Sequence, residues 1–247
     1  MNNPTTKKTI LVTGGSRGIG AAISLELGIK NFNIVVNYNR NKEEAAKIVN
    51  QINASGGNAI ALQANIADQQ ECEKLFQEIQ SAFGNVDILI NNAGITRDKS
   101  FKKMQLSEWN EVINTNLSSA YNTCQLAINS MIENKYGRII NISSVIGQSG
   151  GFGQTNYAAA KAGLIGFSKS LALETAKYGI TVNCICPGFI NTEMVAEMPS
   201  SVLDSIKSKI PAARLGDPND IAKGVSYLIE ASYITGQCLN INGGLYM

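Results

Sequence analysis

The feature that most constrains the fold is a glycine-rich turn near the start of the chain. It follows a β-branched run at residues 9–13 and precedes an amphipathic segment that extends to about Lys30. This order predicts a strand, a tight turn and a helix, with the backbone N–H groups of the turn and the positive end of the helix directed at a bound pyrophosphate. The residues expected to contact the dinucleotide here are Gly14, Ser16, Arg17, Gly18, Ile19 and Gly20.

The glycine spacing is not sufficient evidence by itself. The pattern is GxxxGxG rather than the GxGxxG of many dinucleotide folds, and a glycine-rich turn is often only a turn. The strand before it and the helix after it are what favour a nucleotide site.

Apolar runs and amphipathic segments alternate through the rest of the chain. The runs predict strands at residues 32–38, 59–63, 86–90, 138–142, 180–186 and 237–241, and the segments between them predict helices at 42–54, 68–83, 107–133, 155–178 and 217–230. Alternating βα units form a parallel sheet with helices on both faces. The sequence therefore predicts an α/β fold, a single Rossmann-like domain over residues 1–247 with a doubly wound parallel sheet of about seven strands.

Helix ends are marked by local signals. Asp68 is an expected N-cap, with Glu71 three residues on to complete a capping box. Either Asp217 or Asn219 is expected to open the last helix. Gly179 is expected to end the helix over 155–178, because glycine adopts the left-handed conformation at the C′ position.

The end of the second predicted strand bears on cofactor choice. An NAD-binding unit usually places a carboxylate there for the ribose 2′-hydroxyl, but residues 37–40 are Asn-Tyr-Asn-Arg. Arg40 and Arg17 would meet a 2′-phosphate with cations. We therefore expect NADPH, with Asn37 and Arg40 at the ribose; the alternative is that both arginines are ordinary surface charges. Asn65 and Ile66 follow the third strand and are expected near the adenine.

Composition excludes several classes of function. The chain has 21 basic and 19 acidic residues and a polar start, so we expect a cytoplasmic protein that binds neither nucleic acid nor membrane. Its five cysteines form no CxxC pattern and are expected to be buried, reduced thiols. It has no histidine, which excludes a Ser-His-Asp triad and every histidine-based metal site; no metal is expected.

Tyr157 and Lys161 are the strongest catalytic candidates. Residues four apart on a helix share a face, and an ammonium beside a phenol favours the phenolate and lowers a pKa that is ordinarily about 10. Ser144, at the end of the preceding strand, can hold a carbonyl oxygen while Tyr157 protonates it. Most such Tyr-Lys pairs are a core-edge ring and a solvated lysine, so the functional interpretation depends on the nucleotide turn.

Residues 189–211 interrupt the βα alternation. The segment follows the abrupt end of the sixth strand at Pro187-Gly188, contains several methionines and is broken by Pro199. Insertions at the carboxyl ends of parallel strands usually cover a ligand. We expect a substrate lid, with a plain packed helix pair as the alternative.

Over its whole length the chain resembles the short-chain dehydrogenases/reductases. The residues that carry the resemblance are Thr13-Gly14-x-x-x-Gly18-x-Gly20, Asn91-Asn92-Ala93-Gly94, Asn116, Ser144 and Tyr157-x-x-x-Lys161. The resemblance implies that Tyr157 is the general acid, that Lys161 also binds the nicotinamide ribose, and that Asn116 supports a proton-relay water. It also implies a homotetramer, for which the small apolar faces around Asn116 and Ala160 are suited. Further expected cofactor contacts are Asn92, Ala93, Gly94, Pro187, Gly188 and Ile190.

Within that family two sister activities are similar, the 3-oxoacyl carrier-protein reductases and the acetoacetyl-CoA reductases. Residues 143–148 and 152–156 and the Met194-Val195 pair resemble the second group more, although Gly151 and Phe189 depart from its pattern. Lys99, Lys102 and Lys103 are suited to CoA phosphates or are a solvated cluster. The expected substrate contacts are Asp98, Lys103, Ser144, Phe152, Gln154 and Phe189.

The resulting hypothesis is NADPH-dependent reduction of a 3-oxoacyl thioester, with acetoacetyl-CoA reduced to 3-hydroxybutyryl-CoA. The closest alternative is a 3-oxoacyl-[acyl-carrier-protein] reductase of fatty-acid elongation. A reductase of small alcohols or ketones and a non-catalytic nucleotide sensor are more remote, the latter because a fold alone does not imply chemistry.

Overall fold

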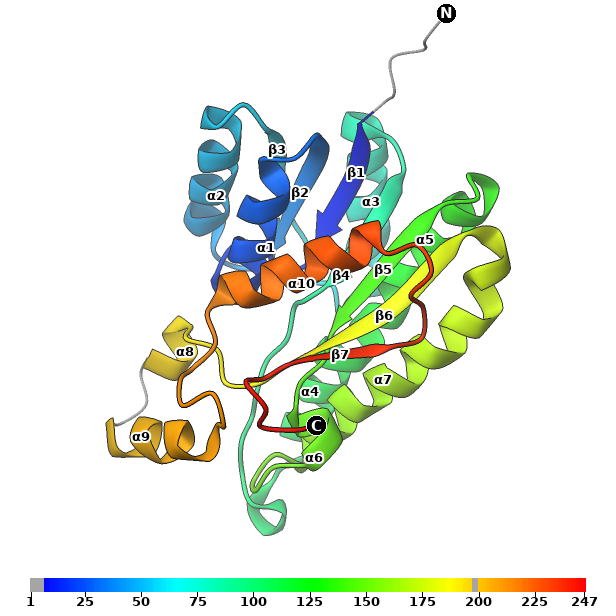
Figure 1. Ribbon diagram of the computed structural model, residues 1–247. Coiled ribbons are helices and arrows are strands. Elements are labelled where there is room, and N and C mark those ends of the chain that lie inside the picture. Colours follow the sequence, from blue (N-terminus) through cyan, green and yellow to red (C-terminus); the bar gives the residue numbers. More distant parts are fainter. Residues whose placement is uncertain (1–6, 197–199) are drawn as a thin grey trace, which may run out of the picture.

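The computed structural model describes residues 7–196 and 200–247. These residues form one seven-stranded parallel sheet in the order β3-β2-β1-β4-β5-β6-β7 (Figure 1). The strands are β1 (Lys8–Val12), β2 (Phe32–Tyr38), β3 (Asn58–Gln63), β4 (Val86–Asn91), β5 (Gly137–Ile142), β6 (Ile180–Pro187) and β7 (Cys238–Ile241). The predicted fold class is confirmed.

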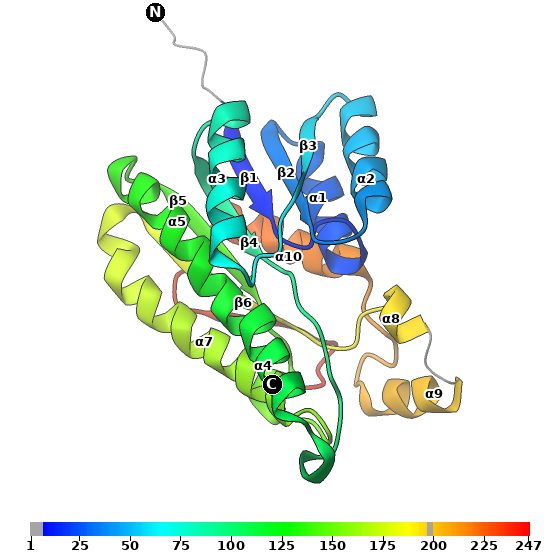
Figure 2. The same ribbon diagram turned by 180° about the vertical axis from the view of Figure 1, so that it is seen from behind.

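Helices cover both faces of the sheet, as Figures 1 and 2 show from opposite sides. The helices are α1 (Gly18–Gly28), α2 (Lys42–Ala54), α3 (Gln69–Phe83), α4 (Leu106–Ile113), α5 (Ser119–Glu133), α6 (Ile146–Ser149), α7 (Thr155–Thr175), α8 (Glu193–Ala196), α9 (Ser200–Lys209) and α10 (Pro218–Glu230). Helices α1, α2 and α10 pack on one face, and α3, α5 and α7 pack on the other. None of the described helices is long and apolar enough to cross a membrane.

The strands supply core residues to both faces in alternation. In β1, Ile10 and Val12 pack with the α1 side, whereas Leu11 packs with the α3 side. Burial on both faces explains why these strands are near-continuous runs of branched aliphatic residues. The strand order reverses between β1 and β4, so the carboxyl ends of these two strands diverge into a ligand-binding edge.

The predicted helix signals are largely confirmed. Asp68 caps α3 by accepting from the Glu71 N–H (3.0 Å), Asp217 caps α10, and Gly179 is left-handed (φ +73°). The helix over 155–178 ends in a 3₁₀ turn at Ala176–Tyr178. One detail is wrong: the Glu71 carboxylate accepts from the Asn65 N–H (2.7 Å), so no reciprocal capping box forms.

The helical stretch predicted over residues 107–133 is confirmed, but it is not one regular α-helix. A π-helical segment, η2 (Asn114–Ser118), separates α4 from α5. Asn116 lies inside it and is buried. Apolar periodicity could not reveal the break, because a one-residue insertion shifts the pattern without removing it.

The segment over residues 189–211 contains α8 and α9, which lie beside the carboxyl edge of the sheet (Figure 1). Residues 197–199, including Pro199, and the Met194 side chain lie outside the described part. Elsewhere, all five cysteines are free in this structure; four are buried as expected, whereas Cys238 is half-buried.

Candidate active site

Two glycines of the turn adopt backbone conformations that disfavour other residues: Gly14 and Gly18 have φ values of +60° and +52°. Gly20 is required for a different reason, since a Cβ there would lie 2.2 Å from the Gly14 carbonyl oxygen. The Asn92 amide, at the end of β4, donates to the carbonyl oxygens of Thr13 (3.0 Å) and Gly14 (3.1 Å). The turn is thus held closed onto the start of α1.

Two further side chains, those of Thr13 and Asn37, hydrogen-bond the backbone of the turn and of the neighbouring loops. The Thr13 hydroxyl oxygen accepts from the N–H groups of Asn92 (3.0 Å) and Ala93 (3.1 Å). Asn37 is buried; its oxygen accepts from the Gly14 N–H (3.3 Å), and its amide donates to the Ala64 carbonyl (3.1 Å). The Asn37 side chain therefore positions the turn, and its direct contact with a ribose stays a prediction.

Two arginines lie near the glycine turn and the carboxyl end of β2, and neither has a carboxylate residue next to it in the sequence. Arg17, the residue that precedes α1, and Arg40, just past β2, are both exposed. In the described part of the chain, neither takes part in an ion pair. Asn65, at the end of β3, accepts from the Ala67 N–H (3.2 Å), so its side-chain oxygen is turned toward its own loop.

The three catalytic candidates converge at the carboxyl ends of β5 and β6. Ser144 follows β5, whereas Tyr157 and Lys161 lie one turn apart on α7. The Ser144 hydroxyl oxygen accepts from the Ile146 N–H (3.1 Å), and the Ser144 side chain is close enough to Tyr157 to lower the pKa of its phenol. The first element of the sequence hypothesis, a serine and a phenol able to hold one oxygen, is therefore present.

Lys161 is buried, with 3% of its surface exposed. Its ammonium donates to the Ile142 carbonyl oxygen (2.7 Å) and lies 5.6 Å from the centroid of the Tyr157 ring. Because burial penalises the charged form, the pKa of Lys161 is lowered to about 8.

The expectation that Lys161 lowers the pKa of Tyr157 is wrong for this structure. Desolvation raises the pKa of Tyr157, the nearby Asp98 carboxylate raises it further, and the Ser144 hydrogen bond opposes them. The physical reason is that the ammonium is committed to the Ile142 carbonyl rather than to the phenol.

We expect the buried lysine to leave a pH signature in stability. Its pKa is about 8 when folded and 10.5 ordinarily, so between these values the unfolded chain binds more protons. The free energy of unfolding of the wild type should therefore rise with pH across this window, by on the order of 3 kcal/mol relative to Lys161→Met. Urea unfolding of both proteins from pH 7 to 10.5 measures this difference; parallel curves would contradict it.

Asn116 makes backbone contacts on both sides of its amide. The oxygen accepts from the Ile95 N–H (2.9 Å), and the nitrogen donates to the carbonyls of Ile95 (2.9 Å) and Val112 (3.0 Å). It thereby fixes the loop after β4, where a Cβ on Gly94 would lie 2.4 Å from the Asn116 oxygen. The proton-relay role stays a prediction. Both Asn116 and Ala160 are buried within the chain, so neither side chain itself forms a face for another subunit.

The expected nicotinamide side of the site is formed by two loops. Gly94 approaches Lys161, whose nitrogen would lie 3.6 Å from a Cβ at Gly94. Across the site, the Pro187 carbonyl accepts from the Val145 N–H (2.9 Å) and Gly188 packs on Asn242. The residues that follow β4, β5 and β6 therefore lie at one edge of the sheet, and their contacts with a nicotinamide stay a prediction.

The expected substrate residues divide into two groups. The Gln154 amide donates to the Asp98 carboxylate (2.8 Å), and Asp98 is close enough to act on the pKa of Tyr157. Phe152 is 98% exposed, Lys103 is also exposed, and Phe189 is half-buried. The structure thus brings Asp98 and Gln154 to the catalytic residues, but gives the Phe152 and Lys103 side chains no such placement.

Two residues near the site were not anticipated. Asn156 is fully buried; its oxygen accepts from the Tyr157 N–H (2.8 Å), and its amide donates to the Arg97 carbonyl (3.1 Å). It joins the start of α7 to the loop after β4, and a polar residue directly before Tyr157 was the available signal. Thr192, at the start of the 189–211 segment, approaches Gly18, with its methyl 3.4 Å from a Cβ placed there.

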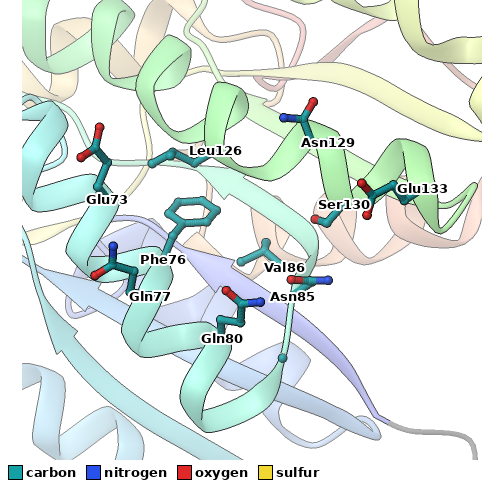
Figure 3. Close-up of a pocket in the computed structure, with 11 residues that line it drawn as sticks. Glu73, Phe76, Gln77, Gln80, Asn85, Val86, Leu126, Asn129, Ser130 and Glu133 are labelled. Carbon is teal, nitrogen blue, oxygen red and sulfur yellow. The ribbon is translucent and has the colours of Figure 1, made fainter.

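A separate hollow of about 510 Å³ lies between α3 and α5 (Figure 3). Phe76 and Leu126 form apolar lining, and Glu73 and Glu133 lie at its rim. Val86, at the amino end of β4, also lines it, whereas the catalytic residues lie at the carboxyl edge. It is therefore not part of the site described above.

Comparison with known proteins agrees with this geometry. The family model described as short chain dehydrogenase matches residues 8–202. The chain is 46% identical over 242 residues to the 3-oxoacyl-[acyl-carrier-protein] reductase FabG of Staphylococcus aureus (strain Mu50), covering 97% of this chain and 98% of that protein. The enzymes of that name from Haemophilus influenzae and Escherichia coli (strain K12) match with the same identity and coverage. The chain belongs to the short-chain dehydrogenase family and is an oxidoreductase that acts on CH–OH and C=O groups with a nicotinamide cofactor.

Proposed function

We propose that this protein reduces a 3-oxoacyl thioester to the 3-hydroxyacyl thioester with NADPH, and that an acyl carrier protein carries the acyl chain. The observation that carries the proposal is the near-full-length identity to enzymes of that name together with the Ser144–Tyr157 contact beside Lys161. The relatives favour the carrier protein over the acetoacetyl-CoA that the sequence patterns favoured.

The residues at the first turn fit NADPH. Gly14 and Gly20 leave the backbone free of side chains where the diphosphate would approach, and the N-terminus of α1 faces that point. Residues 37–40 provide no carboxylate for a ribose 2′-hydroxyl. Exposed Arg17 and Arg40 are the groups that would hold a 2′-phosphate by charge-assisted hydrogen bonds.

The chain's own residues supply the acid half of the reaction. When bound, the reduced nicotinamide supplies a hydride to the carbonyl carbon. The hydroxyls of Ser144 and Tyr157 hold the carbonyl oxygen, on which negative charge develops. Tyr157 then donates its proton to that oxygen, which its raised pKa in this structure permits because the phenol is protonated at neutral pH. We assign to Lys161 the role of holding the ribose and, once its ammonium turns from the Ile142 carbonyl, of stabilising the phenolate.

Acetoacetyl-CoA remains the second candidate substrate. The stretches at residues 143–148 and 152–156 resemble the CoA reductases, and the exposed Lys102 and Lys103 offer charge for CoA phosphates. A nucleotide sensor without catalysis is disfavoured, because it would not need Ser144, Tyr157 and Lys161 together.

The proposal is tested by measuring the reduction rates of acetoacetyl carrier protein and of acetoacetyl-CoA, each substrate with NADPH and with NADH. We expect kcat/KM at least tenfold higher with the carrier protein and with NADPH. A preference for the CoA thioester would replace the proposed substrate, and failure with every 3-oxoacyl thioester would reject the function. Arg40→Ser should reduce the NADPH preference, whereas Lys102→Ser, a matched loss of an exposed cation away from the turn, should leave it unchanged.

We propose in addition that the 189–211 segment covers bound substrate and that the enzyme works as a homotetramer. The position of Thr192 near Gly18 supports the first, since it brings the start of the segment close to the dinucleotide turn. Protection of residues 189–211 from proteolysis when NADPH binds tests the first proposal. Analytical ultracentrifugation, which measures the mass of the assembly in solution, tests the second.

A further inference from the structure

Three of the five thiols lie together on one face of the sheet. Cys184 and Cys186 are two apart in β6, so their side chains point to the same face, and both are fully buried. Cys184 is the register partner of Cys238 in the neighbouring parallel strand β7. Cys238 therefore projects to the same face as the two thiols of β6.

The spacing of Cys184 and Cys238 suits a disulfide bond. Neighbouring strands lie about 4.8 Å apart. That separation falls within the roughly 4.4–6.8 Å that a disulfide requires between Cα atoms. The other two cysteines belong to a different place, since Cys72 lies on α3 and Cys124 on α5.

The three thiols differ in reactivity. Cys238 is half-buried, whereas Cys184 and Cys186 have no exposed surface. Hydrogen bonds from Cys184 and Cys186, with a smaller contribution from Lys169, lower the pKa of the Cys238 thiol. The pKa of the Cys184 thiol is raised by the same contact and by burial. A half-buried thiol with a lowered pKa next to a buried thiol is an arrangement in which oxidation can be followed by disulfide formation.

The cluster is connected to the catalytic helix. The Cys184 sulfur donates to the Ser168 hydroxyl on α7 (3.1 Å), and Ser168 donates to the Leu164 carbonyl (2.7 Å), one turn after Lys161. A change of bonding at Cys184 is therefore transmitted to the part of α7 that holds the lysine.

We propose that Cys238 is a site of reversible oxidation by a peroxide, that it forms a disulfide with Cys184, and that this bond lowers reductase activity by releasing Cys184 from Ser168 beside Lys161. The Cys238 thiolate attacks the peroxide, whose O–O bond breaks to give Cys238 sulfenic acid and hydroxide. The Cys184 sulfur then attacks the sulfenic sulfur, the S–O bond breaks, and water leaves with the Cys184 proton. Two electrons pass from the two sulfurs to the peroxide, which accounts for the oxidation.

Peptide mapping of the purified enzyme after treatment with hydrogen peroxide tests the chemistry without any substrate. We expect a Cys184–Cys238 cross-link that dithiothreitol removes. NADPH oxidation with the best 3-oxoacyl thioester should fall at least tenfold in the same sample and recover on reduction. A cross-link to Cys186, or a Cys238 sulfenic acid that persists without a cross-link, would contradict the proposal.

Matched serine variants separate this site from general oxidation. Cys238→Ser should keep its activity in peroxide, and Cys184→Ser should form the sulfenic acid but no disulfide. Cys72→Ser, which removes a buried thiol on α3, should lose activity as the wild type does. Equal peroxide sensitivity of Cys238→Ser and wild type would overturn the inference. If either serine variant does not fold, the wild-type map together with recovery on reduction decides the question.

Discussion

Replacing Tyr157 with phenylalanine is expected to lower kcat by about 10²–10⁴-fold, the usual contribution of a positioned general acid. The variant keeps the ring that lies beside Lys161 and loses only the hydroxyl, the group close to Ser144. Since the hydroxyl acts on the carbonyl oxygen rather than on the dinucleotide diphosphate, the Kd for NADPH should change less than threefold. Stopped-flow turnover with a 3-oxoacyl thioester and fluorescence titration with NADPH measure the two quantities.

The matched control is Tyr233→Phe, because Tyr233 is fully exposed and distant in sequence from the catalytic helix. It should match the wild type in both assays. Turnover by Tyr157→Phe within a factor of three of the wild type would remove Tyr157 from the mechanism. Equal loss of turnover and NADPH affinity would instead indicate that the ring position, and not the proton, was disturbed.

Replacing Gly20 with alanine is expected to damage both stability and cofactor binding. The new methyl group would lie 2.2 Å from the Gly14 carbonyl oxygen and 2.6 Å from the Asn92 amide nitrogen. The Asn92 amide and the Gly14 carbonyl are hydrogen-bonded to each other and close the turn. The clash with the new methyl group can therefore be removed only if the backbone moves. Overpacking of this kind costs about 1–3 kcal/mol. We expect that loss in urea unfolding and at least a tenfold rise in the Kd for NADPH.

Gly166→Ala is the control for the same substitution in a helix. A Cβ at Gly166, on α7, would meet no other atom within 4 Å. Alanine there should raise helix stability by about 0.8–1.0 kcal/mol and leave NADPH affinity unchanged. The prediction would be contradicted if Gly20→Ala were as stable as Gly166→Ala and bound NADPH with the wild-type Kd. The close contact between Gly20 and the Gly14 carbonyl would then not be needed for NADPH binding.

The fold could be predicted from the sequence because the patterns that indicate its strands and helices are local and recur along the chain. Each buried strand is a short apolar run, and the turn at Gly14 and Gly20 lies between the first such run and a helix. The sequence also located Ser144, Tyr157 and Lys161, since helical spacing and the end of a strand are enough to bring them to one edge of the sheet.

The details that depend on partners distant in sequence were not accessible. The hydrogen bonds of the Asn37 side chain to the Gly14 N–H and to the Ala64 carbonyl, just past β3, were not anticipated. Glu71 was expected to cap its own helix, and it binds the Asn65 N–H instead. The pKa of Tyr157 depends on where the Lys161 ammonium finds a carbonyl, which spacing along one helix does not determine.

The π-helical segment at Asn114–Ser118 restricts how this region can change in length. A regular helix advances about 100° per residue, so one extra residue rotates everything on its far side by that angle. The buried Thr123 and Cys124 of α5 face the sheet only with that rotation in place relative to Val112 of α4. Single-residue deletions between 113 and 119 should therefore turn polar α5 side chains such as the exposed Gln125 into the interior. Exposed loops, in contrast, generally tolerate changes of length.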